Sequence, residues 1–118
     1  MRPERLSPKE RAHLVRLVAC WSKRLRVTPR VVRVQQMRRK WGSCSTGGTI
    51  TLASELVRQT SRFQNFVVAH ELLHMRIPNH SKLFKAMLSA HVPGWRHHAA
   101  RLKRGDRRLT PERRTIKS

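Results

Sequence analysis

Two histidines and a glutamate within five consecutive residues could bind a metal ion and use it for hydrolysis. His70 and His74 are four positions apart, a spacing that places both side chains on one face of a helix. Glu71 follows His70 directly and is rotated to one side, where its carboxylate can hydrogen-bond a water on the metal instead of binding the metal itself. The pattern predicts a zinc-dependent hydrolase with Glu71 as general base.

A third protein ligand is expected, because catalytic zinc typically has three protein ligands and keeps one position for water. The acidic residues after Glu71 are Asp106 and Glu112, and both lie in a polar segment that we expect to be a tail. A glutamate ligand from a downstream helix is therefore not expected, and a histidine is the better candidate.

His80, six residues after His74, is that histidine. A continuous helix would put it on the wrong face, but Pro78 disfavours helical dihedral angles at Ile77, and a turn at Pro78 and Asn79 can return the chain to the metal. The spacing matches the zinc-protease signature H-E-x-x-H-x-x-G-x-x-H, although Ile77 replaces its glycine, so the turn must follow another backbone path. We therefore expect one zinc ion with three ligands: His70, His74 and His80.

Two other interpretations of the motif stay open. A bare H-E-x-x-H arises by chance in a small fraction of chains, and no metal would then be bound. A structural zinc ion would need the three histidines and a fourth ligand, either Cys44 or His91. The third histidine and the amphipathic helix expected around His70 favour the catalytic interpretation.

The helix that carries the two histidines is one of four that the sequence predicts. Ser61-Arg62-Phe63-Gln64 is a capping-box pattern, so this helix should begin near Ser61, and Pro78 should end it. An earlier helix is predicted from Pro8 to Arg24, because Ser7-Pro8-Lys9-Glu10 is a capping box with proline at the first helical position. Two shorter helices follow, one capped by Ser81 with Phe84, Met87, Leu88 and His91 inward, and one over Trp95–Lys103.

Two strands should lie between the first two long helices. The β-branched residues after Pro29 predict a strand over Val31–Met37, and Thr49–Leu52 alternates polar and apolar residues. We expect the two strands to be antiparallel and the segment Trp41–Gly48 to be a loop or turn. The sequence predicts a single small α+β domain over residues 7–104, with a flexible arm at 1–6 and a basic flexible tail at 105–118.

The charge of the chain is strongly unbalanced. Lysine and arginine number 27 against 6 acidic residues, a formal net charge of +21. Such a charge predicts salt-dependent attraction to polyanions, although solvated arginine on an ordinary surface is the simpler interpretation. The residues that we expect to contact nucleic acid, if it is a partner, are Arg38, Arg39, Lys40, Arg96, Arg101, Lys103 and Arg104.

The remaining composition indicates a protein of a reducing compartment. No apolar run approaches the length needed to cross a bilayer and no signal peptide is recognisable, so we expect a cytoplasmic protein. Two cysteines do not form a disulfide framework in a chain of 118 residues. We expect Cys20 and Trp41 in the core, and Ser43 and Cys44 in a turn.

Three segments together resemble the YgjP-like metallopeptidase family: Trp41-Gly42-Ser43-Cys44-Ser45, Gly48-Thr49-Ile50-Thr51-Leu52, and His70-Glu71-Leu72-Leu73-His74 with Asn79-His80-Ser81 and Phe84. That family is similar to SprT-like proteins, whose members include proteases that act at DNA–protein crosslinks. The resemblance covers about Val31 to Leu102. It implies a zincin-type minidomain, zinc bound by the three histidines, Glu71 as catalytic base, and a strand near Ile50 along the cleft. Ala53-Ser54 stand where relatives often have an asparagine and an aromatic residue, and the chain resembles a minimal member.

The expected reaction is hydrolysis of peptide bonds in a polypeptide substrate. If the strand Thr49–Leu52 is a sheet edge, an extended peptide could pair with its main chain. The expected substrate contacts are Thr49, Ile50, Thr51, Asn79 and His91. The chain has no tyrosine, so a backbone N–H, Asn79, His91 or an arginine must stabilise the oxyanion.

Two functions of other classes would use parts of the same sequence. The first is a zinc-dependent phosphohydrolase that acts on nucleotides, since a metal-activated water in a basic cleft would serve that reaction as well. The second is a nucleic-acid-binding module whose zinc ion is structural.

Overall fold

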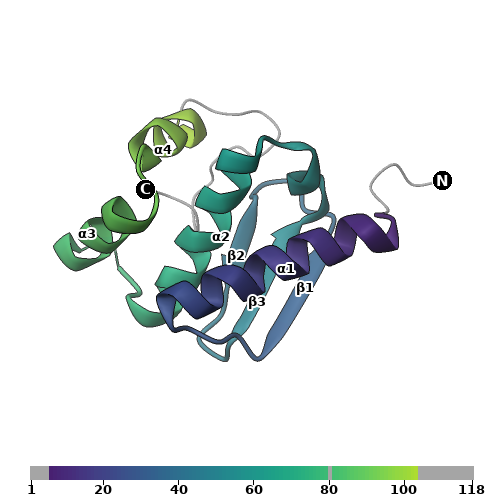
Figure 1. Ribbon diagram of the computed structural model, residues 1–118, viewed down its shortest axis with the longest axis horizontal. Helices are drawn as coiled ribbons and strands as arrows, with labels where there is room; N and C mark the ends of the chain where they lie inside the picture. Colours follow the sequence, from purple (N-terminus) through teal and green to yellow (C-terminus); the bar gives the residue numbers. More distant parts are fainter. Residues whose placement is uncertain (1–5, 80, 104–118) are drawn as a thin grey trace.

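The computed structural model describes residues 6–79 and 81–103, and only the backbone of 101–103. Its elements are α1 (Pro8–Leu25), β1 (Val31–Gln35), β2 (Gly42–Cys44), β3 (Thr49–Ala53), the 3-10 helix η1 (Ser54–Arg58), α2 (Ser61–Arg76), α3 (Lys82–His91) and α4 (Trp95–Lys103). Helices α1 and α2 pack on one face of the sheet, and α3 and α4 lie beyond α2 (Figure 1). The predicted α+β class is confirmed. The predicted arm and tail fall almost wholly outside the described residues.

The sheet differs from the predicted antiparallel pair. Its strand order is β1-β3-β2, with β1 parallel to β3 and β2 antiparallel to β3. The segment expected to be a loop therefore contributes an edge strand, and the predicted antiparallel pairing of Val31 with the Thr49 segment is wrong. A polar segment with glycine and serine reads as a turn from the sequence alone, yet here it pairs with buried β3 and closes a hairpin in which Thr49 N donates to Ser45 Oγ at 3.2 Å.

Helix α2 begins one residue earlier than its capping-box pattern suggested. The cap is Thr60, whose hydroxyl accepts the backbone N–H of Phe63 at 3.1 Å. Gln64 is consequently not a capping residue: its amide donates to the carbonyls of Val57 and Gln59, and its carbonyl lies 2.8 Å from the His13 ring. This buried amide joins α1, η1 and the start of α2, and so fixes the position of the helix that carries the candidate metal ligands.

The buried face of α1 explains why Cys20 is not a core residue. Its buried residues are Leu14, Val18, Trp21 and Leu25, which recur at helical spacing. Cys20 stands next to Trp21 but points away from this face and is exposed, so its predicted place in the core is wrong. Trp41, in contrast, is only 2% exposed, as predicted for a core residue.

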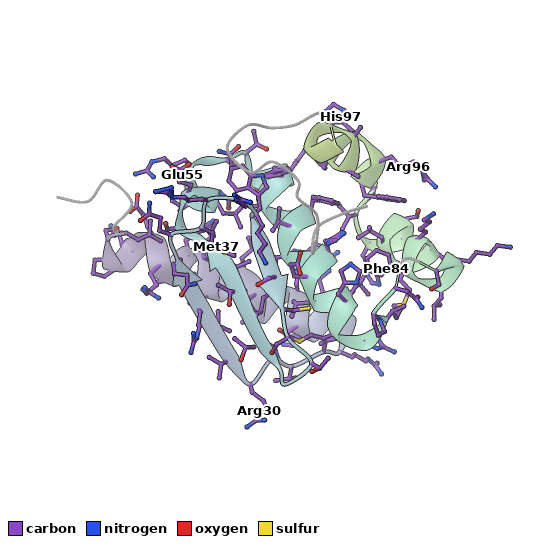
Figure 2. All side chains as sticks on the ribbon, turned by 180° about the vertical axis from the view of Figure 1, so that it is seen from behind. Arg30, Met37, Glu55, Phe84, Arg96 and His97 are labelled. Carbon is purple, nitrogen blue, oxygen red and sulfur yellow. The ribbon has the colours of Figure 1, made fainter. Side chains whose placement is uncertain are left out.

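Trp41 packs edge-on against Phe63 at a centroid separation of 5.3 Å, and so brings the start of β2 against α2. The contact joins the two layers of the molecule, because Trp41 directly precedes β2 of the sheet and Phe63 belongs to α2, which covers the sheet. Figure 2, seen from behind, shows the strands in front of α1 and Phe84 of α3 directed toward α2. Within the described residues, no helix is long and apolar enough to cross a membrane.

We predict that Leu52→Ala lowers the free energy of unfolding by about 2–5 kcal/mol, because Leu52 is fully buried in the central strand and its removal leaves a cavity. The matched control is Val31→Ala in β1, whose side chain is 43% exposed and should cost far less. Urea unfolding of both variants tests the prediction. Equal losses in the two variants would contradict the placement of β3 at the centre of the sheet.

Candidate metal centre

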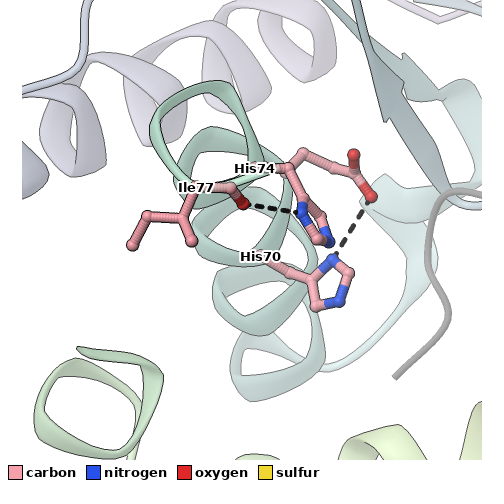
Figure 3. Close-up of polar contacts among 4 residues, drawn as sticks. His70, His74 and Ile77 are labelled. Atoms are coloured by element: carbon pink, nitrogen blue, oxygen red, sulfur yellow. Dashed lines mark hydrogen bonds and ion pairs between the residues drawn. The ribbon is translucent and has the colours of Figure 1, made fainter. Parts of the chain in front are cut away.

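Two consecutive turns of α2 bring His70 and His74 together. Their ring centroids lie 4.7 Å apart and the ring planes meet at 79°. His70 is completely buried, whereas His74 is partly exposed. The predicted pairing of the two imidazoles on one helical face is therefore present, and Figure 3 shows the two rings side by side.

Glu71 lies between these histidines in the sequence and beside them in space. Its side chain is fully buried, and its Oε2 lies 3.4 Å from His70 Nδ1 (Figure 3). The side chain leaves the helix toward β2, where a Cβ added at Gly42 would lie 3.1 Å from Glu71 Cγ, and the Cys44 thiol is close enough to influence the pKa of the carboxyl group. A buried carboxyl group next to two imidazoles is the arrangement that a general base at a metal centre requires.

Aromatic side chains line the space around the two imidazoles. Phe84 of α3 stacks on His74, with centroids 4.4 Å apart and planes only 20° from parallel, and it meets His70 edge-on at 5.5 Å. Phe66, one turn before His70, lies 5.4 Å from that ring. These contacts hold both imidazoles in place and keep water away from their apolar edges.

His74 has the partner that a metal-binding histidine usually has. Its Nδ1 lies 3.2 Å from the carbonyl oxygen of Ile77, and because a carbonyl can only accept, Nδ1 must carry the proton. The lone pair is then on Nε2, the atom available to a metal ion. The hydrogen bond exists because the helix ends there: Ile77 has an extended backbone (φ −127°, ψ 93°) ahead of Pro78.

Burial controls the protonation of the site. It lowers the pKa of His70 to about 3, so the ring is neutral at pH 7, the state in which imidazole binds metals. Burial also raises the pKa of Glu71 to about 8, against the opposing charges of His74 and Lys40 and the contact with Cys44. The pKa of the Cys44 thiol is raised to about 12, first by burial and then by Glu71. The donor set of the described residues, two imidazoles beside a carboxyl group, fits a zinc ion.

The predicted third ligand, His80, lies outside the described residues. Within the described ranges, no group of three or more His, Cys, Asp or Glu side chains is arranged to bind a metal ion. The segments on either side of position 80 both reach His74, since Ile77 accepts its hydrogen bond and Phe84 stacks on its ring. Ser81 caps α3, as predicted, by accepting the N–H of Phe84 at 3.3 Å.

The predicted substrate contacts are only partly near this centre. The strand that carries Thr49 and Thr51 is central, not an edge, and Ile50 is fully buried in the core, so the prediction of a substrate-binding edge there is wrong. Asn79 is exposed directly after α2. His91 lies at the other end of α3 from Phe84, with its ring 6.3 Å from that of Trp21.

His91 instead lines a groove that is distinct from the metal centre. The groove has a volume of about 870 Å³ and lies among α1, the start of α2 and the α3–α4 turn, with Trp21, Arg24, Asn65 and His91 among its lining residues. Asn65 precedes His70 by five residues, which turns it by about 140° around the helix axis. The groove and the imidazole pair thus lie on different sides of α2.

Four of the seven residues predicted to contact nucleic acid have side chains that the structure describes: Arg38, Arg39, Lys40 and Arg96. Arg38 and Arg39 are exposed, and Lys40 is half-buried close enough to Glu71 to influence its pKa. Arg96 is exposed, with its guanidinium 4.5 Å above the Trp95 ring. The side chains of Arg101 and Lys103, and the whole of Arg104, lie outside the described residues. Among the four described side chains, no observation joins Arg96 of α4 to the three cations that precede β2 in one surface.

Sequence reasoning assigned Cys44 to a turn and missed its contact with Glu71. The signal that could have revealed the contact is the pair Gly42 and Cys44, two residues apart, because alternate residues of a strand point to the same face. Phe84 was predicted to point inward, but its stacking on His74 was not foreseen. Both contacts depend on tertiary packing.

Comparison with known proteins gives one family and a shared fold. Residues 4–105 match the family model described as YgjP-like, metallopeptidase domain. The chain is similar to the structure of the metallopeptidase zymogen of Pyrococcus abyssi abylysin, with a TM-score of 0.69 and 21% identity over 83% of this chain and 99% of the other. It is also similar to the zymogen of Methanocaldococcus jannaschii jannalysin, with a TM-score of 0.60 and 22% identity over 66% of this chain and 80% of the other. No curated protein matches the sequence significantly.

We predict that Glu71→Gln stabilises the metal-free protein more at pH 8 than at pH 5. Burial raises the folded-state pKa of Glu71 to about 8 from an ordinary value of 4.5. The folded state thus binds this proton more tightly, and the resulting stability, full below pH 4.5, is lost as the pH rises to 8. Glutamine does not titrate. The free energy of unfolding of Glu71→Gln relative to the unsubstituted protein should therefore increase by at least about 1.4 kcal/mol from pH 5 to pH 8, the equivalent of one pKa unit. Urea unfolding with a chelator measures this; an equal effect at both pH values would contradict it.

Proposed function

The chain belongs to the YgjP-like metallopeptidase family, and we propose that it is a peptidase with one zinc ion bound by His70, His74 and His80. Glu71 is the general base of the reaction. The observation that carries the proposal is the fully buried carboxyl group of Glu71 beside two imidazoles on consecutive turns of α2.

The metal and the protein have separate tasks. A bound zinc ion would act as a Lewis acid toward the scissile carbonyl, lower the pKa of a bound water toward neutrality and, by its charge, favour the ionised form of Glu71. His74 is oriented for binding by its hydrogen bond to Ile77, and His70 by its burial against Phe66 and Phe84.

Glu71 moves the proton. Its carboxylate accepts a proton from the attacking water and then donates it to the leaving amine nitrogen. The aromatic walls of Phe66 and Phe84 and the burial of the carboxyl group limit competing hydration, which strengthens the interactions of the carboxylate. Lys40 provides a positive charge on the same side and favours the ionised state of Glu71.

His80 is the third ligand in this proposal. The support is positional: the helix ends at Arg76, the turn residue Ile77 is bonded to His74, and α3 begins with Phe84 stacked on that same ring. The short segment that joins these two contacts contains His80. Because both of its ends are fixed at His74, a ligand supplied from this segment has little distance to cover.

The substrate chain would pair with β2. Among the described strands, β2 is an edge strand and packs against α2 at Glu71, whereas β3 is central and Ile50 is buried. An extended peptide added to the open edge of β2 would make main-chain hydrogen bonds there and pass beside the carboxyl group of Glu71. This replaces the earlier expectation of a substrate edge at Thr49–Thr51.

We predict that Glu71→Gln keeps one zinc ion per chain and lowers kcat by about 10²–10⁴-fold, because the ligands remain while the general base is lost. His74→Ala and His80→Ala should lose both zinc and turnover. His97→Ala, which removes an exposed histidine of α4, is the matched control and should change neither. Metal analysis and peptide hydrolysis assays measure these effects. Zinc content unchanged in His80→Ala, or turnover kept in Glu71→Gln, would refute the respective assignment.

A narrower part of the proposal concerns which polypeptides are cleaved. The net charge of +21 favours polypeptides that are bound to nucleic acid, because such a charge concentrates the enzyme near polyanions. The affinity for DNA should then fall by at least about tenfold between 50 and 200 mM salt. A binding titration at several salt concentrations measures the slope of log affinity against log salt. A slope near zero would remove nucleic acid from the proposal.

A further inference from the structure

Strand β2 crosses α2 at the position of Glu71, and Gly42 lies at the crossing. A Cβ atom added at Gly42 would lie 3.1 Å from Glu71 Cγ, 3.3 Å from the carbonyl oxygen of Thr51 and 3.4 Å from Val67 Cγ1. The first two separations are closer than ordinary van der Waals contact, and the Thr51 carbonyl belongs to the backbone of central strand β3. The space occupied by the Glu71 side chain therefore exists because residue 42 has no side chain.

Cys44 follows two residues later on the same strand, so its side chain points to the same face as position 42. It is half-buried and close enough to the Glu71 carboxyl group for each of the two groups to shift the pKa of the other. The strand itself is held firmly, because Gly42 pairs with Leu52 and Cys44 with Ile50, both completely buried. Gly42 and Cys44 thus both lie next to the side chain of Glu71.

We infer that β2 positions the general base: Gly42 gives the Glu71 side chain its path, and the Cys44 thiol donates its S–H to the carboxylate and fixes its orientation. Both are positioning residues for the proposed peptidase reaction, on which this inference rests. Catalytic hydrogen bonds of this kind are often long before substrate binds and shorten in the complex.

The chemistry of a thiol suits this task. An ordinary thiol has a pKa of about 8.5 and is mainly protonated at neutral pH, so Cys44 can donate a hydrogen to the carboxylate. Sulfur is a weak donor, and a weak hydrogen bond orients a carboxylate without strongly reducing its basicity. A cationic side chain or a set of backbone N–H groups at the same place would lower the pKa of the carboxyl group and weaken the base.

Kinetics of the zinc-loaded full chain test the inference. Cys44→Ala should lower kcat by at least about tenfold with KM and zinc content unchanged, because only the orientation of the base is lost. Cys44→Ser keeps a donor and should recover most of the loss, and Cys20→Ala, at the exposed cysteine, should have no effect. An unchanged kcat in Cys44→Ala, or a serine variant as impaired as the alanine variant, would overturn the inference.

Gly42 has a matched control in the same hairpin. Gly42→Ala should lower kcat while zinc stays bound, since the added methyl group displaces Glu71 and not the histidines. Gly47→Ala should be nearly neutral, because a Cβ there would meet only Ser45 Oγ at 3.7 Å. Equal kcat values in the two variants would contradict the role of Gly42.

A second measurement is independent of activity and separates this inference from the proposed function. In the metal-free protein, Cys44→Ala and Glu71→Gln should change the unfolding equilibrium constant non-additively by at least about twofold, whereas Cys20→Ala and Glu71→Gln should be additive. Additivity of the Cys44 pair would overturn the inference. If Glu71→Gln itself retained full turnover, the assignment of Glu71 as general base would be refuted. The unfolding measurements would still show whether the Cys44 and Glu71 side chains interact.

Discussion

The completely buried carboxyl group of Glu71 determines how the sheet and helix α2 can pack against each other. Removal of Glu71 from water penalises its charged form, and burial accordingly raises its pKa to about 8. The buried carboxyl group lies where α2, the edge strand β2 and two imidazoles meet. Trp41 and Gln64 hold the surrounding layers in register, the first between β2 and α2, the second among α1, η1 and α2. The candidate metal centre thus lies where both layers of the domain meet.

The sequence was informative wherever local physics decides the structure. Both long helices, the Pro78 stop and the Ser81 cap follow from capping hydroxyls and proline, so their bounds were predicted to within one or two residues. The pairing of His70 with His74 follows from helical periodicity alone. The sheet could not be read in this way, because Gly42–Cys44 lacks the β-branched residues that mark strands and pairs only through the backbone with β3. For the same reason the sequence did not reveal that Ile50 lies in the central strand and that β2 is an edge strand.

Three residues lie in places that the sequence did not predict, and the cause is the same for each: tertiary packing decides which side of a helix or strand is buried. Cys20 is small and stands beside Trp21, yet it lies outside the helical stripe that packs on the sheet. Gln64 reads as a capping residue, yet its amide is used inside the domain. Cys44 reads as part of a turn, yet the hairpin directs it to Glu71. Each residue's chemistry was recognisable in the sequence, but its partner was not.

A crystal structure of the zinc-loaded protein would test the assignment of the three histidine ligands. We expect one zinc ion with nitrogen atoms of His70, His74 and His80 at about 2.0–2.1 Å, and with the Glu71 carboxylate beside the open position but not bonded to the metal. A zinc ion bonded to Glu71 or to Cys44 sulfur at about 2.3 Å, or a His80 ring remote from the metal, would contradict it.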